Sequence, residues 1–204
     1  LLINTKHPIK VIGDRSLSKR DFRRITDPLS KFGAKFKLTR GKNLPLTIFG
    51  SQKLKSINYV EKKGSAQCKS SVIFGGMRAN GTTIIKAKKS RNHTELLCKY
   101  LNLPISVKIK KNHDEIKINK VKTINPLNYK IPSDISSSAF FIVLTALSNN
   151  SELIIKNVNI NPSRIGIITI LRKMGISIIF KNKKIYKGEK IADILIKSPK
   201  SIKS

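Results

Sequence analysis

The sequence contains no tryptophan, only two cysteines and few aromatic residues, which make up 6% of its 204 positions. The two cysteines, Cys68 and Cys98, are too few for a disulfide framework and lack the spacing of a metal site. Because free cysteines persist in reducing compartments and no secretory or transit signature opens the chain, we expect a cytoplasmic protein. No apolar run approaches the roughly 20 residues of a membrane-spanning helix, so we expect no membrane partner.

Acidic residues are also scarce, since 11 Asp and Glu face 42 Lys and Arg and give a net charge of +31. Such a charge suggests nucleic acid or another polyanion as partner. It also has a compositional explanation, because Lys, Ile and Asn, whose codons are AT-rich, make up 81 residues spread along the whole chain. The sequence has no arginine-rich helix, zinc finger or basic tail, and few aromatic platforms for bases. We therefore favour a small anionic ligand, and a basic nucleic-acid-binding module is the alternative.

Several catalytic signatures are missing as well. The sequence has no P-loop, no dinucleotide fingerprint and no His and Cys residues at metal-ligand spacing. We therefore expect neither a cofactor nor a metal. No nucleophile–base pair can be assigned, so we name no catalytic residue.

The best-defined element predicted from the sequence is a helix that begins after Ser65. Ser65 is a suitable N-cap, apolar residues between Ala66 and Met77 provide a broad hydrophobic face, and Asn80 with Gly81 is predicted to end the helix. Polar residues collect at the N-terminal end, where unpaired backbone N–H groups and the helix dipole attract anions. The pattern fits an ordinary capped core helix as well as an anion site.

A repeat of 71 residues organises the chain. Junctions that begin at Phe32, Leu103 and Met174 share one pattern, in which a helix end is followed by an alternating strand. Two further pairs share the spacing: Ser65 with Ser136, each predicted to cap an apolar helix, and Arg20 with Arg91. Each unit of about seventy residues is predicted to hold a capped helix, a strand, an Arg-led helix and two strands, and the first lacks its leading helix. Units of this kind pack against one another, which predicts an α/β fold.

Hydrophobic periodicity and turn residues locate the individual elements. Strands are predicted at 9–12, 34–38, 44–49, 83–86, 105–109, 116–118, 153–155, 176–180 and 194–196. Besides the helix from Ser65, helices are predicted at 22–32, 90–101, 139–147 and 161–174, the last of them opened by residues 161–164.

Polar residues recur near the predicted helix starts. They are Ser18 with Arg20, Ser65 with Gln67, and Ser90 with Arg91. If equivalent ends of the units meet, these groups suit a phosphate, because Arg offers bidentate donors and Ser hydroxyls and helix N–H groups fill the remaining acceptor sites. Each arginine alone could equally be a solvated surface charge. Asp134 could cap the helix that follows it or act as a base, and both interpretations remain open.

Five segments, taken together, resemble consecutive motifs of the EPSP synthase (5-enolpyruvylshikimate-3-phosphate synthase) family in order and spacing. They are 13–20, 65–70, 90–95, 134–141 and 161–166. The resemblance covers nearly the whole chain. It implies the two-lobed enolpyruvyl transferase-like fold, with three βαβαββ units per lobe, here incomplete. We assign 1–131 to part of one lobe, with two repeat units of which the first is incomplete, and 132–204 to one unit of the other lobe.

The resemblance also implies an activity. Family members are transferases that move the enolpyruvyl group of phosphoenolpyruvate to shikimate 3-phosphate and release phosphate, in the shikimate pathway of aromatic amino acid biosynthesis. The implied contacts to shikimate 3-phosphate are Ser65, Ala66, Gln67, Ser90 and Arg91. The implied contacts to phosphoenolpyruvate are Arg20 and Gln67. We expect a monomer at full length, with no nucleic acid bound.

The sequence departs from the family pattern at several positions. Asp21 stands where the family usually has Pro, directly after Arg20, and its carboxylate could weaken anion binding there. Asn92 replaces the usual Asp, Ser133 the usual Gly, and Lys62–Gly64 a more apolar segment. None of these changes removes an implied ligand.

The family's remaining motifs, including its Asp base, are not found in this sequence, so we expect a fragment that is inactive alone. A sister enolpyruvyl transferase acting on a nucleotide sugar would share the architecture, and an inactive decayed copy would share the motifs. The Ser-Ala-Gln motif at Ser65 and the Arg-Asn-His-Thr-Glu motif at Arg91 favour the shikimate enzyme.

Overall fold

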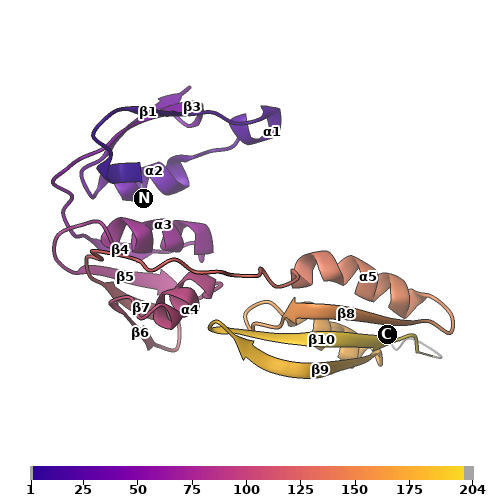
Figure 1. The fold of residues 1–204 in the computed structure, drawn as a ribbon. Coiled ribbons are helices and arrows are strands. Elements are labelled where there is room, and N and C mark those ends of the chain that lie inside the picture. Colours follow the sequence, from indigo (N-terminus) through magenta and orange to yellow (C-terminus); the bar gives the residue numbers. More distant parts are fainter. Residues whose placement is uncertain (1, 200–204) are drawn as a thin grey trace. The chain divides into compact units, whose positions relative to one another are not determined.

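The computed structural model describes residues 2–199, which form two compact units (Figure 1). The first unit takes in the described residues up to Ser90 together with Leu101–Ile124. The second takes in Arg91–Tyr100 together with the described residues from Asn125 onward. None of the helices among residues 2–199 has the length and apolar character needed to cross a bilayer.

The first unit contains two sheets. One has the order β1-β3-β2 and is antiparallel throughout, with strands β1 (Ile9–Val11), β2 (Lys35–Thr39) and β3 (Asn43–Phe49). The other has the order β4-β5-β7-β6, with strands β4 (Asn58–Glu61), β5 (Thr83–Lys88), β6 (Ile105–Ile109) and β7 (His113–Ile118). In this second sheet β4 and β5 are parallel and the other neighbours are antiparallel.

Helix α3 (Ala66–Gly76) lies between helix α2 (Arg23–Ser30) and the four-stranded sheet (Figure 1). A glycine pair makes this arrangement possible. A Cβ on Gly75 would lie 2.7 Å from Cε2 of Phe32, and a Cβ on Gly76 would lie 2.5 Å from Cγ2 of Ile118. The helix therefore packs closely on both sides at its C-terminal end. The remaining helical segments of this unit are η1 (Leu2–Asn4) and α1 (Arg15–Ser18).

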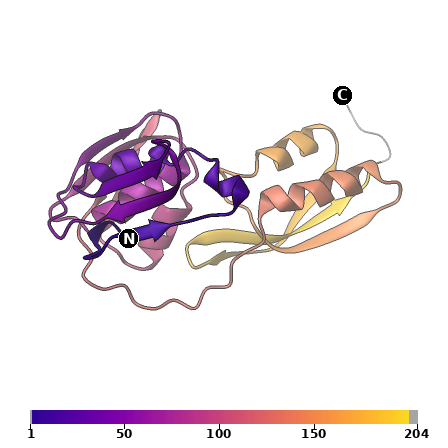
Figure 2. The same ribbon diagram turned by 90° about the horizontal axis from the view of Figure 1, so that it is seen from above.

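The second unit has one antiparallel sheet of order β8-β10-β9, with strands β8 (Glu152–Asn159), β9 (Ser177–Tyr186) and β10 (Glu189–Lys197). Its helices are α4 (His93–Tyr100), α5 (Ile135–Leu147) and α6 (Gly166–Lys173). Helix α5 runs along the sheet (Figures 1 and 2). Buried residues of α5 and α6 join those of the three strands in one hydrophobic cluster, which includes Ile142, Ile168 and Ile194.

The predicted repeat is confirmed by the strand orders. In each repeat the last strand lies in the middle of its sheet, between the two other strands of the repeat, giving β1-β3-β2, β5-β7-β6 and β8-β10-β9. The second repeat adds the parallel strand β4 at its edge, and the third adds a single parallel bridge between Ser133 and Val158. The chain therefore consists of related α/β units, and the α/β fold class predicted from the sequence is confirmed.

Several predicted helix boundaries are wrong. Helix α4 begins at His93 rather than at Ser90, and α6 begins at Gly166 rather than within 161–164. Helix α3 ends at Gly76 rather than at Asn80, because the residues after it bond to other segments: the Met77 carbonyl accepts from the Val121 N–H (2.9 Å), and the Asn80 N–H donates to the Leu54 carbonyl (3.0 Å). Helix α5 begins before Ser136, which therefore does not cap it. Its N-cap is Asp134, as described below.

Three short elements were not predicted: η1, helix α1 and strand β4. Helix α1 has four residues, and the carboxylate of its N-cap Asp14 accepts from the Leu17 N–H (2.7 Å). Strand β4 is defined by its parallel pairing with β5, from Asn58 opposite Ile84 to Glu61 opposite Ala87. The other predicted strands are present, and several extend beyond their predicted ends.

Candidate substrate-binding residues

In the first unit, the candidate binding residues follow two neighbouring parallel strands. Strand β4 leads into the N-terminus of α3, and β5 leads to Ser90. The carboxyl ends of parallel neighbours meet at one sheet edge, the usual position of ligand sites in α/β proteins. The segment before α3 and the segment after β5 approach each other closely at Gly64. Gly64 adopts a φ of +70°, and a Cβ there would lie 3.3 Å from the Lys89 carbonyl oxygen. The segments carrying Ser65 and Ser90 are therefore adjacent.

Ser65 is the N-cap of α3, as predicted. Its backbone is extended (φ −86°, ψ 106°), and its Oγ accepts from the Cys68 N–H at 3.2 Å. Ala66 and Gln67 are the first two helical residues and are partly exposed. Their backbone N–H groups lie in the first turn, which has no intrahelical acceptors and carries the positive end of the helix dipole. An anion can bind here through backbone N–H groups and the Ser65 and Gln67 side chains.

The loop before Ser65 is held by Glu61, a residue that the sequence analysis did not single out. Glu61 is buried at the end of β4, and its carboxylate accepts from the N–H groups of Lys63 (3.0 Å) and Gly64 (2.7 Å). These bonds fix the turn that delivers the chain to α3. The only sequence signal was an acidic residue three positions before a glycine, which is too common to be informative.

Ser90 has an unusual environment. Its Oγ is buried and has no hydrogen-bond partner among the residues that the structure describes. Buried polar atoms are satisfied in most proteins, and an unsatisfied hydroxyl at a sheet edge fits a ligand contact. This geometry agrees with the role that the resemblance implies for Ser90.

Arg20 lies directly after α1, and its side chain is exposed. Its backbone is fixed, because its N–H donates to the Leu17 carbonyl (3.0 Å) and its carbonyl accepts from Nδ2 of Asn43 (3.1 Å). The neighbouring Asp21 does not leave an uncompensated charge beside it. The Asp21 carboxylate accepts from Nε (3.0 Å), Nη2 (2.5 Å) and the backbone N–H (2.9 Å) of Arg23.

The pairing with Arg23 also changes the acidity of Asp21. The side-chain bonds from Arg23, followed by its backbone bond, lower the pKa of Asp21 to about 2. Asp21 is therefore ionised and neutralised by its partner at physiological pH. Asp21, Arg23 and Ser65 all line one hollow of about 670 Å³ in the first unit, which also exposes Lys62 and Lys63.

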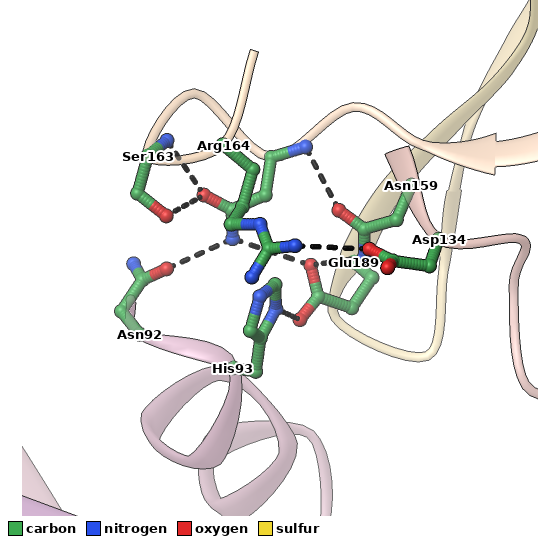
Figure 3. A network of polar contacts seen from close by, with 8 residues as sticks. Asn92, His93, Asp134, Asn159, Ser163, Arg164 and Glu189 are labelled. Atoms are coloured by element: carbon green, nitrogen blue, oxygen red, sulfur yellow. Dashed lines mark hydrogen bonds and ion pairs between the residues drawn. The ribbon is translucent and has the colours of Figure 1, made fainter. Parts of the chain in front are cut away.

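In the second unit, Arg91 lines a cavity of about 360 Å³ whose wall combines charged residues with apolar ones such as Ile131 and Ile135. Its charged or ionisable lining residues are Arg91, His93, Tyr129, Asp134, Arg164 and Glu189. Figure 3 shows that Asn92 and His93, at the start of α4, point toward the segment of Ser163 and Arg164 and toward Glu189. The residues that line the cavity thus come from the start of α4 and the residue two positions before it, the segment leading into α5, the end of β8, the segment before α6, and β10.

Glu189 bonds three side chains of this cavity region through its two carboxylate oxygens. Its Oε1 lies 2.6 Å from Nδ1 of His93, and its Oε2 accepts from Nδ2 of Asn159 (3.1 Å) and Nδ2 of Asn161 (3.3 Å). Burial raises the pKa of Glu189, but the bonds from His93 and the two asparagines outweigh it and bring the pKa below its usual range. Sequence analysis missed Glu189 and Asn159, because no local motif marks them, and it named Asn161 only as the first residue of the family-like segment 161–166 without giving it a role.

Asp134 is a helix cap and an ion-pair partner, which resolves the two interpretations left open by the sequence. Its Oδ1 accepts from the Ser136 N–H (3.2 Å) and from Nη2 of Arg164 (2.9 Å). The Ser136 hydroxyl, which was predicted to cap α5, instead bonds Nη2 of Arg164 at 2.6 Å. Burial raises the pKa of Asp134, but the Ser136 N–H and the Arg164 charge lower it overall. An ionised, paired carboxylate of this kind is a poor general base.

Comparison with known proteins identifies the family of this chain. The sequence profile of the family described as EPSP synthase (3-phosphoshikimate 1-carboxyvinyltransferase) matches residues 2–202. The chain belongs to the EPSP synthase family. The predicted resemblance is confirmed by this match, which covers nearly the whole sequence.

Individual EPSP synthase family members are similar over the same region. The chain is 40% identical over 193 residues to 3-phosphoshikimate 1-carboxyvinyltransferase of Hydrogenovibrio crunogenus, covering 94% of this chain and 43% of that protein. It is 41% identical over 188 residues to the enzyme of the same name from Caldicellulosiruptor saccharolyticus, covering 91% of this chain and 43% of that protein. The chain thus spans less than half the length of these relatives.

Solved structures give the same result for the fold. EPSP synthase from Acinetobacter baumannii superimposes with a TM-score of 0.83 at 36% identity, over 98% of this chain and 45% of that one. The enolpyruvyl transferase NikO from Streptomyces tendae superimposes with a TM-score of 0.65 at 11% identity, over 98% of this chain and 46% of that one. The second likeness shows the shared fold alone, and it confirms the expected enolpyruvyl transferase-like architecture.

Proposed function

We propose that the protein to which this chain belongs transfers the enolpyruvyl group of phosphoenolpyruvate to shikimate 3-phosphate and releases phosphate. The observation that carries the proposal is the family match over residues 2–202, at about 40% identity to proteins with that name. The chain spans less than half of those relatives, so the activity is proposed for the whole protein. This 204-residue chain is expected to release no phosphate from the two substrates by itself.

Shikimate 3-phosphate is the proposed ligand of Ser65, Ala66, Gln67, Ser90 and Arg91. The capped N-terminus of α3 offers backbone N–H groups to a phosphate, and the buried Ser90 hydroxyl offers a polar partner at the same sheet edge. Arg91 would add the bidentate donors that phosphate and carboxylate accept. These residues bind and orient the substrate, and none of them is assigned a proton transfer.

Phosphoenolpyruvate is the proposed ligand of Arg20 and Gln67. The fixed backbone of Arg20 supports this role, since an exposed arginine on an anchored turn can meet an anion without ordering its own main chain. The pairing of Asp21 with Arg23 supports it further, because it removes the unfavourable charge that the sequence placed beside Arg20.

Several properties remain predictions. We expect residues 1–131 and 132–204 to belong to different lobes, the full-length protein to be a monomer, and its location to be the cytoplasm. The free and buried state of Cys68 and Cys98 is compatible with a reducing compartment. We also expect no nucleic acid as partner, in spite of the net charge of +31.

Calorimetric titration of the purified chain at near-physiological salt tests the proposal. Shikimate 3-phosphate, inorganic phosphate and a short oligonucleotide are titrated separately. Saturable binding of shikimate 3-phosphate in preference to the other two supports the proposal. Preferential binding of the oligonucleotide, with a steep dependence on salt, would instead support a nucleic-acid-binding module. Absence of shikimate 3-phosphate binding by a folded chain would contradict the assignment of these residues.

A further inference from the structure

The two residues that follow Arg91 are both held by side chains distant in the sequence. Nδ2 of Asn161 donates to Oδ1 of Asn92 at 2.8 Å, and Glu189 bonds the His93 ring at 2.6 Å. We propose that Asn161 and Glu189 are positioning residues for Arg91, which fix the turn that carries it and thereby the affinity for the anionic substrate. The role of Arg91 itself rests on the proposed function.

Asn161 and Glu189 form one connected network. Nδ2 of Asn161 donates both to Asn92 and to Oε2 of Glu189, the latter at 3.3 Å. Oδ1 of Asn161 accepts from the N–H (2.9 Å) and the hydroxyl (2.7 Å) of Ser163, and the Asn161 N–H donates to Oδ1 of Asn159 at 2.9 Å. Because each bond restricts the donors and acceptors of the next, the network favours one arrangement of the Asn92 and His93 side chains.

Burial makes the network sensitive to small changes. Asn161 is 3% exposed and Glu189 is 5% exposed. Hydrogen bonds at buried sites are electrostatically strong, and loss of one partner leaves the other buried and unsatisfied. A substitution that removes one acceptor should therefore disturb the turn at Asn92 more than an equivalent change at an exposed ion pair.

The network also sets the charge that faces the cavity. Glu189 is compensated by His93 and two amide groups, and Asp134 is compensated by Arg164. Both carboxylates that line the cavity beside Arg91 are thus already bonded to donors. Hydrogen bonds and the Arg164 ion pair thus hold both carboxylates in place beside Arg91.

The position of Asn92 also affects the backbone hydrogen bonds in the first turn of α4. The Asn92 carbonyl accepts from the Leu96 N–H at 3.0 Å, in the first turn of the helix. The exchange rate of the Leu96 amide therefore reports whether Asn92 is held in place, without any ligand. This measurement separates the positioning of the turn from the binding of a substrate.

The test compares Asn92→Ala, Asn92→Asp and Glu189→Gln in the 204-residue chain. Asn92→Ala removes the acceptor for Asn161, and we expect the Leu96 amide to exchange about tenfold faster and shikimate 3-phosphate to bind about tenfold more weakly. Asn92→Asp keeps an acceptor oxygen, so Leu96 exchange should stay within about twofold of the wild type. Its added negative charge beside Arg91 should weaken anion binding separately, so Leu96 exchange is the readout for this variant. Glu189→Gln should give an intermediate loss, because the amide keeps the shape but not the charge.

Glu152→Gln is the matched control. Glu152 forms an exposed ion pair with Lys197 (2.8 Å) on the same sheet, and its loss should change neither measurement. The free energy of unfolding, measured with urea for each variant, shows whether faster Leu96 exchange comes from local opening or from lower global stability. Unchanged Leu96 exchange and unchanged affinity in Asn92→Ala, or failure of Asn92→Asp to restore the Leu96 exchange, would overturn the inference. If the wild type does not bind shikimate 3-phosphate, the proposed function fails, and the Leu96 exchange still decides whether the network fixes the turn.

Discussion

The side chains of His93 and Glu189 meet at 2.6 Å, although 96 residues separate them in the sequence. His93 is the first residue of α4, and Glu189 is the first residue of β10. The contact therefore joins the segment that carries Arg91 to the central strand of the β8-β10-β9 sheet. Arg91, the proposed substrate ligand, stands two residues before His93, so its segment is tied to this strand through the His93–Glu189 contact.

The first prediction concerns acid stability and Asp193, in β10. The bond from the Asn157 N–H (2.9 Å), followed by that from the Asn182 side chain (2.8 Å), lowers the pKa of Asp193 from 3.8 to about 2. A lowered folded-state pKa stabilises the fold above the ordinary carboxyl pKa, and this contribution is lost as the pH falls toward 2. Asp193→Asn should melt at a lower temperature than the wild type at pH 6, and the two melting curves should converge near pH 2. Parallel curves from pH 6 to pH 2 would contradict this account of Asp193.

The second prediction concerns the close packing of α3. Ala favours a helix over Gly by about 1 kcal/mol, but a Cβ on Gly76 would lie 2.5 Å from Ile118 and 3.0 Å from Thr83. Overpacking of this kind costs about 1–3 kcal/mol, so Gly76→Ala should lower the free energy of unfolding. Gly166→Ala, in α6, is the control, because a Cβ there meets no atom within 4 Å and should not destabilise. Urea unfolding measures the free energy of unfolding of both variants. Equal changes in the two variants would show that packing against Ile118 and Thr83 is not the cause.

The third prediction concerns the compensation of Asp21. Arg23→Ala leaves the Asp21 carboxylate without its partner beside Arg20, so the affinity for phosphoenolpyruvate should fall about two- to fivefold at low salt and less at high salt. Asp21→Asn in the same background should restore it. Arg24→Ala removes the same charge from the same hollow but leaves the Asp21–Arg23 pair intact, and it should have a smaller effect. Equal losses in the two arginine variants would mean that only net charge matters. The measurement is calorimetric titration in the presence of shikimate 3-phosphate.

The fourth prediction concerns an apolar stripe on α5. Four large side chains on this helix are exposed: Phe140, Phe141, Leu144 and Leu147. Contiguous apolar surface promotes association, so the chain should self-associate with increasing concentration in analytical ultracentrifugation. Leu144→Lys should reduce association without lowering the melting temperature, whereas Ile142→Lys, at a position that is 0% exposed, should unfold the second unit. A chain that stays monomeric at all concentrations would contradict the prediction.

The repeated architecture could be predicted from the sequence because its signals are local. Each junction between a helix end and a strand start carries Gly33, Pro104 or Gly175 followed by alternating apolar residues, and the 71-residue spacing of the junctions survives in three sheets of equivalent strand order. Strand β4 could not be predicted, because Asn58–Glu61 is short and becomes a strand only through its pairing with β5. Asn80 and Gly81 carry the right residues for a helix end, but tertiary hydrogen bonds from residues 77–80 end α3 earlier.

In the candidate site, too, the sequence predicts the features that local residues determine and misses those that depend on contacts between distant segments. Ser65 and Gln67 stand at a helix start that the sequence marks clearly, and the structure places Ser65 as the cap. The supporting residues Asn161 and Glu189 were not predictable, because their contacts join segments 69 and 96 residues apart. Asp134 rather than Ser136 caps α5, because its carboxylate accepts hydrogen bonds both from the Ser136 N–H at the helix N-terminus and from Nη2 of Arg164.

The most direct test of the central claim is a map of amide chemical-shift changes in the labelled chain during titration with shikimate 3-phosphate. The account predicts saturable changes at Ala66, Gln67, Ser90 and Arg91, with the lysine-rich strand β9 unaffected. Changes confined to β9, or changes that scale with added inorganic phosphate alone, would contradict the claim that this chain carries part of the substrate site.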